Sequence, residues 1–246
     1  MKDIRNEFVS KIETAIKEAL GFHAILAFGK DAPAGKIANT LNARLFYGVG
    51  HPNNPKRMIS YSPKHIEIQQ KPGEKPNVVL ELYLTEIIQH WYDFLEDVYK
   101  KALTDNYYNN CGYQLSSQKI LLDFNSKDNQ LYDDIISKSV LDFNFLPAKE
   151  KLRILKKLFN ADFSDCESEL DNLKENIQVR NILQHRLGFI EVKDISDLDG
   201  TKIKEDHGDK IVEKSAGQRV SRTVFDLENL VLDLKKISAN LVEKCT

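Results

Sequence analysis

The chain has 246 residues, of which 41% are hydrophobic and 29% charged, and its 35 basic and 37 acidic side chains give a formal net charge of −2. This composition is that of an ordinary globular protein, and the near-neutral charge argues against an overall basic coat for nucleic acid. The three cysteines, Cys111, Cys166 and Cys245, are too scattered for a disulfide framework. The first residues are charged throughout and no apolar stretch approaches the ~18 residues of a membrane span, so we expect a cytoplasmic protein without a membrane anchor.

Residues 1–75 predict a small α/β N-terminal extension. Apolar positions at near-helical spacing over residues 4–19 predict a first helix, and Gly21 is placed to end it as a C-cap residue. Weak alternation of apolar and polar residues over 58–61 and 66–69 predicts two short strands. A segment that contains Pro and Gly then closes this extension.

The hydrophobic periodicity changes after this point to that of long amphipathic helices, so residues 76–246 are expected to form a helical domain. The predicted helices cover residues 80–103, 128–143, 147–159, 164–187 and 223–241. Two short runs, at 210–213 and 219–223, flank Ala216-Gly217 and predict a small β-hairpin before the last helix. The predicted fold class is mainly α, an up-and-down helical bundle of about five long helices with that short β-hairpin.

Capping signals mark the ends of two of these helices. Ser164 with Glu167 three residues later has the pattern of a capping box, and so does Thr223 with Asp226. Gly188 stands where it would stop the helix that begins near Ser164. Ser164 and Gly188 therefore predict the start and the end of the helix that carries the polar residues discussed below.

Two common ligand motifs do not fit the sequence. Gly29 and Gly35-Lys36 resemble a phosphate-binding P-loop, but they are one residue too far apart, and Ile37 replaces the Ser or Thr that would hold magnesium. The six histidines form no H-x-x-x-H pair and no zinc-binding pattern. We therefore expect no metal and no cofactor.

The most distinctive polar pattern is R-N-x-x-x-H, formed by Arg180, Asn181 and His185. On a helix, Gln178, Asn181 and His185 fall within about 60° of one another and form a polar stripe. Arg180 lies about 140° from His185 and points toward an apolar arc, where a guanidinium is costly unless an anion or a partner subunit receives it. Arg180 and His185 therefore act together only if the Arg side chain swings round, the helix end bends, or a second copy of the helix faces the first.

This pattern near the end of a long helix, with Gly188 close behind, resembles the signature of HEPN domains, in which an Arg and a polar residue are followed by a His after a short spacer. The order of elements is similar too: an earlier long amphipathic helix, a short basic helix, the motif helix, a small hairpin and a C-terminal helix. The resemblance covers roughly residues 76–246. The sequence differs from the commoner pattern by having Arg186-Leu187 where a polar pair often precedes the Gly.

The resemblance implies a metal-independent endoribonuclease of the kind found among toxins and anti-phage defence effectors. It implies a homodimer that joins two motif helices around one RNA cleft, and an antitoxin or another protein as a further partner. His185 would act as general base or acid, since an unperturbed imidazole titrates near neutral pH. Arg180 would stabilise charge on the phosphate during attack by the 2′-hydroxyl, and Asn181 would orient the imidazole or hold a phosphate oxygen.

A basic helix just before the motif helix supplies a candidate RNA-binding surface. Residues 147–160 contain five basic side chains against the single acid Glu150, and Gln178 joins them as a predicted RNA contact. The five basic residues are Lys149, Lys151, Arg153, Lys156 and Lys157. A solvated helix face would have the same composition, so this alternative stays open.

Two other interpretations of the motif also stay open. HEPN-like domains that have lost catalysis serve as interaction or scaffolding modules, which bind a partner protein or nucleic acid. In the second interpretation the chain is a plain helical bundle, and the order of Arg180 and His185 is a coincidence.

Overall fold

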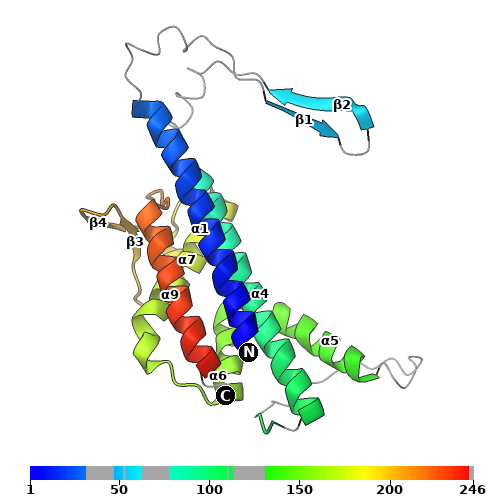
Figure 1. Ribbon diagram of the computed structural model, residues 1–246. Helices are drawn as coiled ribbons and strands as arrows, with labels where there is room; N and C mark the ends of the chain where they lie inside the picture. Colours follow the sequence, from blue (N-terminus) through cyan, green and yellow to red (C-terminus); the bar gives the residue numbers. More distant parts are fainter. Residues whose placement is uncertain (32–46, 52–53, 62–77, 110, 114–130, 244–246) are drawn as a thin grey trace.

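The computed structural model describes residues 1–31, 47–51, 54–61, 78–109, 111–113 and 131–243. The described elements, in chain order, are α1 (Lys2–Asp31), β1 (Tyr47–His51), β2 (Asn54–Tyr61), α4 (Val78–Asn109), α5 (Leu131–Asn144), α6 (Ala148–Phe159), the 3-10 helix η2 (Ser164–Cys166), α7 (Glu167–Arg186), α8 (Val192–Ser196), β3 (Ile203–Asp206), β4 (Ile211–Lys214) and α9 (Val224–Glu243). The protein is mainly helical, with a two-stranded antiparallel hairpin before its last helix (Figure 1), which confirms the predicted fold class.

The core of the bundle lies where α1, α4 and α9 pack side by side (Figure 1). Trp91 and Phe94 of α4 meet Phe8 of α1, whose ring centroid lies 5.8 Å from that of Trp91 and 4.6 Å from that of Phe94. The helical spacing of the apolar residues explains this packing, because it gives each helix one stripe to bury. α7 packs against both α9 and α4.

The predicted N-terminal extension needs one correction, because its helix belongs to the bundle. The residues of α1 that are buried in the common core are Phe8, Ile12, Ala15, Ile16 and Ala19. Residues 58–61 lie in β2, which pairs antiparallel with β1, whereas residues 66–69 lie outside the described part of the chain. The division at residue 76 therefore does not separate α1 from the helices that follow.

The prediction that Gly21 ends the first helix is wrong, because α1 continues to Asp31. A C-cap glycine stops a helix by adopting a left-handed backbone, and Gly21 is not among the described glycines with positive φ. A Cβ placed on Gly21 meets no atom within 4 Å. The residue therefore sits in an ordinary, exposed helical position.

Replacing Gly21 by alanine is expected to raise the free energy of unfolding by about 0.5–1 kcal/mol, because alanine loses less backbone entropy in a helix than glycine does. Denaturant titration of the two proteins measures the difference. Gly188→Ala is the contrasting control: Gly188 has φ +90°, and an added Cβ would lie 2.9 Å from the carbonyl oxygen of Val220. That variant should be less stable than the wild type. A less stable Gly21→Ala protein would contradict a helical Gly21.

Of the two predicted capping boxes, the one at the start of α9 is confirmed. The N–H of Thr223 donates to Oδ2 of Asp226 (2.9 Å), and the N–H of Asp226 donates to Oγ1 of Thr223 (3.2 Å). The other is wrong, because Ser164 begins η2 and α7 starts only at Glu167. Ser164 bonds to Asp162 instead, through its N–H (3.1 Å) and its hydroxyl (3.0 Å). A nearer carboxylate has displaced the capping contact.

The hairpin before α9 is present, and the predicted strand at 210–213 lies almost wholly in β4, but its partner strand is not the predicted one. β3 pairs with β4, and the turn between them contains Gly208, whose φ of +83° suits a tight reversal. Of the predicted strand at 219–223, only Arg219 forms a bridge, and its partner is Phe189. The Ala216-Gly217 turn signal was assigned to the wrong pair of segments.

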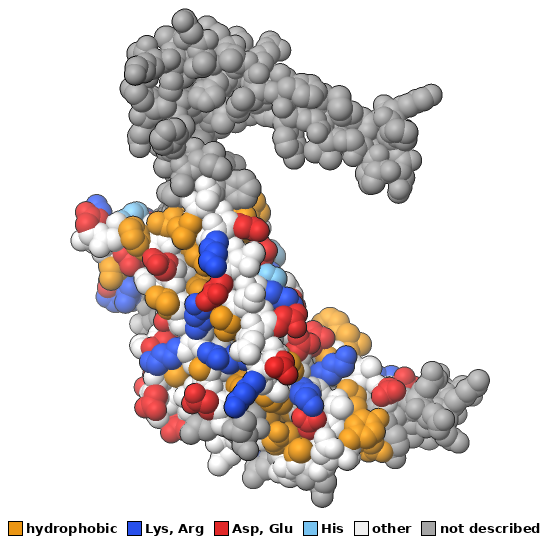
Figure 2. All heavy atoms as spheres, viewed as in Figure 1, with side chains coloured by type: hydrophobic (Ala, Val, Ile, Leu, Met, Phe, Trp, Pro, Cys, Tyr) orange, Lys and Arg blue, Asp and Glu red, His pale blue; other side chains and the backbone are white. Residues whose placement is uncertain are grey.

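Charges of both signs are mixed on the face that carries α1 and α9. Figure 2 shows basic and acidic side chains interspersed on the face that carries α1 and α9, which agrees with a net charge of −2. None of the described helices is both long enough and apolar enough to cross a membrane.

Candidate functional site

Arg180 and Asn181 lie together in the last two turns of α7, where both are half-buried. Nη1 of Arg180 donates a hydrogen bond to Oδ1 of Asn181 (3.2 Å). The Arg side chain thus turns toward Asn181, and it forms no bond with His185. Nε of Arg180 is buried and finds no acceptor in the described part of the chain. The guanidinium therefore keeps hydrogen-bonding capacity that the fold does not use.

Tyr92 of α4 lies within electrostatic range of this pair. Burial raises the pKa of the Tyr92 hydroxyl, and the positive charge of Arg180 opposes that rise. The phenol is therefore protonated at neutral pH. The sequence pattern places Tyr92 on a long helix but carries no signal for its nearness to Arg180.

His185 occupies an exposed position in the last turn of α7. Its ring forms no hydrogen bond or ion pair with any residue that the structure describes, so no neighbour fixes its tautomer. The structure thus brings Arg180 and Asn181 together and leaves His185 outside that pair. An exposed imidazole at this position is open to a substrate or to a second protein chain.

α7 ends in a strained turn directly after His185. Leu187 has φ +53°, in the left-handed region, which costs a residue with a Cβ about 1–2 kcal/mol. Gly188 follows with φ +90°, and its N–H donates to the carbonyl oxygen of Ile182 (3.2 Å). The side chain of Leu187 is 76% exposed, so burial does not offset the strain. The left-handed turn ends α7 and leaves the side chain of Leu187 in solvent close to His185 along the chain.

Two more exposed apolar side chains follow Leu187 closely along the chain. Phe189 is 53% exposed and Val192 is 76% exposed. We refer to Leu187, Phe189 and Val192 as the apolar trio. Exposed apolar side chains close to one another are a common mark of an interaction surface.

Leu187→Gly is expected to raise the free energy of unfolding of the isolated chain by about 1 kcal/mol, because glycine adopts positive φ without steric cost. Denaturant titration at low protein concentration measures this gain. Leu187→Ala is the matched control, since it removes the same exposed side chain and keeps the Cβ that causes the strain. Equal stability of the two variants would show that the backbone of Leu187 is not strained.

Gln178 and Arg186, which lie on either side of the motif residues, anchor the segment after α7. The buried carboxylate of Asp194 in α8 accepts hydrogen bonds from Nε2 of Gln178 (2.7 Å), from Arg186, and from the N–H of Glu191 (2.8 Å). Burial would raise the pKa of Asp194, but these bonds hold that pKa below its ordinary value. Arg186, at which the sequence differs from the commoner HEPN pattern, therefore has a structural partner in Asp194. The RNA contact predicted for Gln178 stays a prediction.

The five predicted basic RNA contacts of α6 differ in their surroundings. Lys149 pairs with Asp199 (3.4 Å), and Arg153 pairs with Glu150 (2.7 Å). Two exposed side chains form no ion pair with the residues that the structure describes, namely Lys156 and Lys157. These two are the members of the set most open to a phosphate.

Lys151 is set apart from the other lysines of α6 because it is only 5% exposed. Its Nζ lies over the rings of Tyr92 and Phe143, 4.8 Å and 5.6 Å from their centroids. Burial lowers the pKa of its ammonium group, and two acidic side chains of α4 oppose this. Lys151 thus lies over the ring of Tyr92, whose pKa the positive charge of Arg180 lowers.

Comparison with known proteins adds no relative. The chain matches no family model, no curated protein and no solved structure. The likeness to HEPN domains therefore stays a prediction from the sequence pattern.

Proposed function

We propose that the protein is a metal-independent endoribonuclease of the HEPN type, acting in the cytoplasm as a toxin or anti-phage defence effector. The observation that carries this proposal is the Arg180–Asn181 pair on α7, with an unused donor on Arg180 and an exposed His185 one turn later. An Arg that stabilises phosphate charge and a His that moves protons are sufficient for attack by a 2′-hydroxyl.

In the proposed reaction, the 2′-oxygen of a ribose bonds to the adjacent phosphorus while the bond from phosphorus to the 5′-oxygen breaks. His185 removes the proton of the 2′-hydroxyl, and the imidazolium returns a proton to the leaving 5′-oxygen. Arg180 binds the non-bridging oxygens, whose negative charge grows in the transition state. The products are a 2′,3′-cyclic phosphate and a 5′-hydroxyl.

The proposed site needs a second copy of the chain. Arg180 and His185 lie about 140° apart around α7, and no bond joins them. A second motif helix across a two-fold axis would bring His185 of each copy toward Arg180 of the other. The apolar trio supports a dimer of this kind, because its three exposed apolar side chains follow His185 closely along the chain.

Incubation of the purified chain with total RNA in excess EDTA tests the proposal. We expect cleavage that persists in EDTA and leaves 5′ ends that accept phosphate from a kinase without prior dephosphorylation. Cleavage should fall steeply as salt rises, because Lys156 and Lys157 would then lose their phosphate contacts. Intact RNA, or cleavage only with added Mg²⁺, would overturn the proposal.

A second candidate function is that of an interaction module without catalysis. The apolar trio favours it, since the same exposed side chains suit a partner protein as well as a second copy. A chain that forms a stable complex through these residues and leaves RNA intact in EDTA would have this function.

A further inference from the structure

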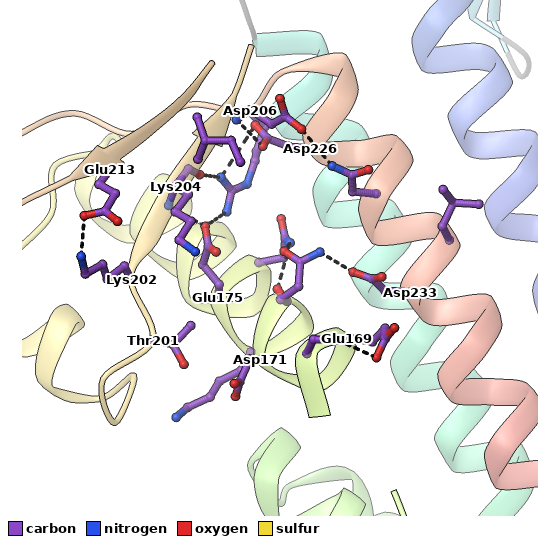
Figure 3. Close-up of a pocket in the computed structure, with 18 of the residues that line it drawn as sticks. Glu169, Asp171, Glu175, Thr201, Lys202, Lys204, Asp206, Glu213, Asp226 and Asp233 are labelled. Carbon is purple, nitrogen blue, oxygen red and sulfur yellow. Dashed lines mark hydrogen bonds and ion pairs between the residues drawn. The ribbon is translucent and has the colours of Figure 1, made fainter. Parts of the chain in front are cut away.

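A second site lies away from Arg180 and His185, in a groove between α7, α9, the β3–β4 hairpin and the turn at residues 199–202. The groove has a volume of 1140 Å³, which is above the usual range for small-molecule sites. Figure 3 shows Glu169 and Asp171 of α7, Asp233 of α9 and Thr201 of the turn around this space. None of the proposed catalytic residues lines it.

The groove is strongly acidic. Eight carboxylates and four basic side chains line it, which gives a net charge of −4. Three of the basic side chains are already held by carboxylates of the same groove: Lys174 by Asp199 (3.1 Å), Lys202 by Glu213 (2.7 Å), and Arg222 by a buried acid of α7. Two lysines outside the lining, Lys236 and Lys149, also pair with carboxylates of the groove, Glu169 and Asp199. The negative charge that favours a cationic ligand therefore comes from the carboxylates that form no ion pair.

Three carboxylates of the groove form no ion pair in the described part of the chain. Asp171 is exposed and forms no ion pair, Asp233 accepts only from the amide of Asn172, and Asp206 accepts from backbone and amide groups. Burial raises the pKa of Asp233, which the amide hydrogen bond only partly opposes. A bound cation would relieve this unfavourable charge.

A buried acceptor in the same groove is also unsatisfied, which is independent of the acidic charge. Asn176 is 1% exposed, and its Nδ2 donates to the carbonyl oxygen of Asn172 (2.9 Å) and to Oδ1 of Asn172 (3.1 Å). Its own Oδ1 receives no hydrogen bond from the residues that the structure describes. Because buried acceptors are nearly always satisfied, this oxygen points to a ligand that carries N–H donors.

We propose that the groove binds a linear polyamine, whose ammonium groups are separated by short methylene chains. The carboxylates are spread over α7, α9 and the hairpin, so several separated charges fit them better than one point charge does. Ile211 and Leu232 line the same groove and are exposed, which gives the methylene segments an apolar surface. One ammonium group donates to Oδ1 of Asn176, and others pair with Asp171 and Asp233.

Calorimetric titration of the whole chain with spermidine at low salt tests this proposal. Asp171→Lys should weaken spermidine binding at least tenfold, because it replaces an exposed acid of the groove by a base. Asp142→Lys is the matched control: it makes the same change of charge at an exposed position of α5, and it should change the dissociation constant less than twofold. Asn176→Leu removes the buried acceptor and should also weaken binding.

Three results would overturn the polyamine site. One is a titration without binding, the second is equal weakening by Asp171→Lys and Asp142→Lys, and the third is binding of spermidine no tighter than that of Mg²⁺ under the same conditions. Asp171 is exposed, so its replacement leaves the fold intact and keeps the test valid if Asn176→Leu fails to fold.

Discussion

Replacing His185 by alanine should lower the rate of RNA cleavage in EDTA by about a hundredfold or more and leave the melting temperature almost unchanged. General acid or base catalysis by a side chain contributes about 10²–10⁴ to a rate. His185 is exposed and bonds to none of the residues that the structure describes, so its loss removes no contact that stabilises the fold. The initial rate of cleavage is the measurement, and His207→Ala is the control at another exposed histidine. Equal rates for the wild type and His185→Ala would remove the nuclease proposal.

A mixture of two inactive variants distinguishes a shared site from a site within one chain. If Arg180 of one copy works with His185 of the other, a mixed dimer of Arg180→Ala and His185→Ala contains one intact set. Statistical mixing would then restore about a quarter of the wild-type rate. A mixture as inactive as its components would show that both residues act from the same chain, or that no dimer forms.

Arg222→Ala should cause the largest loss of stability, about 3–5 kcal/mol in the free energy of unfolding. Arg222 is almost fully buried, with Nη2 3.0 Å from Oε1 of Glu175 and Nη1 donating to the carbonyl oxygen of Lys204 (2.6 Å). Glu175 also accepts from the N–H of Lys204 (2.8 Å). The variant leaves a buried carboxylate without its counter-charge and removes the link that Arg222 makes between α7 and β3. Denaturant titration measures the loss.

Two further variants show whether that loss comes from the unpaired charge. Lys202→Ala breaks the exposed ion pair with Glu213 in the same region and should cost less than about 1 kcal/mol. Glu175→Leu combined with Arg222→Met removes both buried charges and should be more stable than Arg222→Ala alone. An Arg222→Ala protein as stable as the wild type would contradict the structural role of this pair.

The sequence predicts the helices well because each has a single apolar stripe to bury. Trp91 and Phe94 follow this rule, and the structure buries both. The end of α1 could not be predicted in the same way, because a glycine ends a helix only where its backbone adopts a positive φ, and the sequence does not show the φ of Gly21. The prediction for one strand of the hairpin is wrong because two glycine turns, at Gly208 and Gly217, lie on either side of β4, and local sequence does not show which of them joins the paired strands.

The candidate site was predictable as a set of residues but not as an arrangement. The direction of a long side chain such as Arg180 depends on its tertiary neighbours, and Tyr92 comes from another helix. The spacing of Lys151 does indicate its burial. Lys151 precedes Leu155 and Leu158 by four and seven residues, which places it on the buried face of α6. Its charge made it look like part of an exposed basic surface.

The contact between α1 and α9 has a consequence for synthesis of the protein. Apolar residues of α1 such as Ile12 are covered partly by α9, and an ion pair between Glu13 and Lys235 joins the two helices. A ribosome makes α1 and α4 before α9, so the face of α1 that packs against α9 stays uncovered until α9 has been translated, although α4 can cover its other side earlier. The core of the bundle is therefore complete only after translation has passed α9, and chaperones would meet the open face of α1 in the meantime.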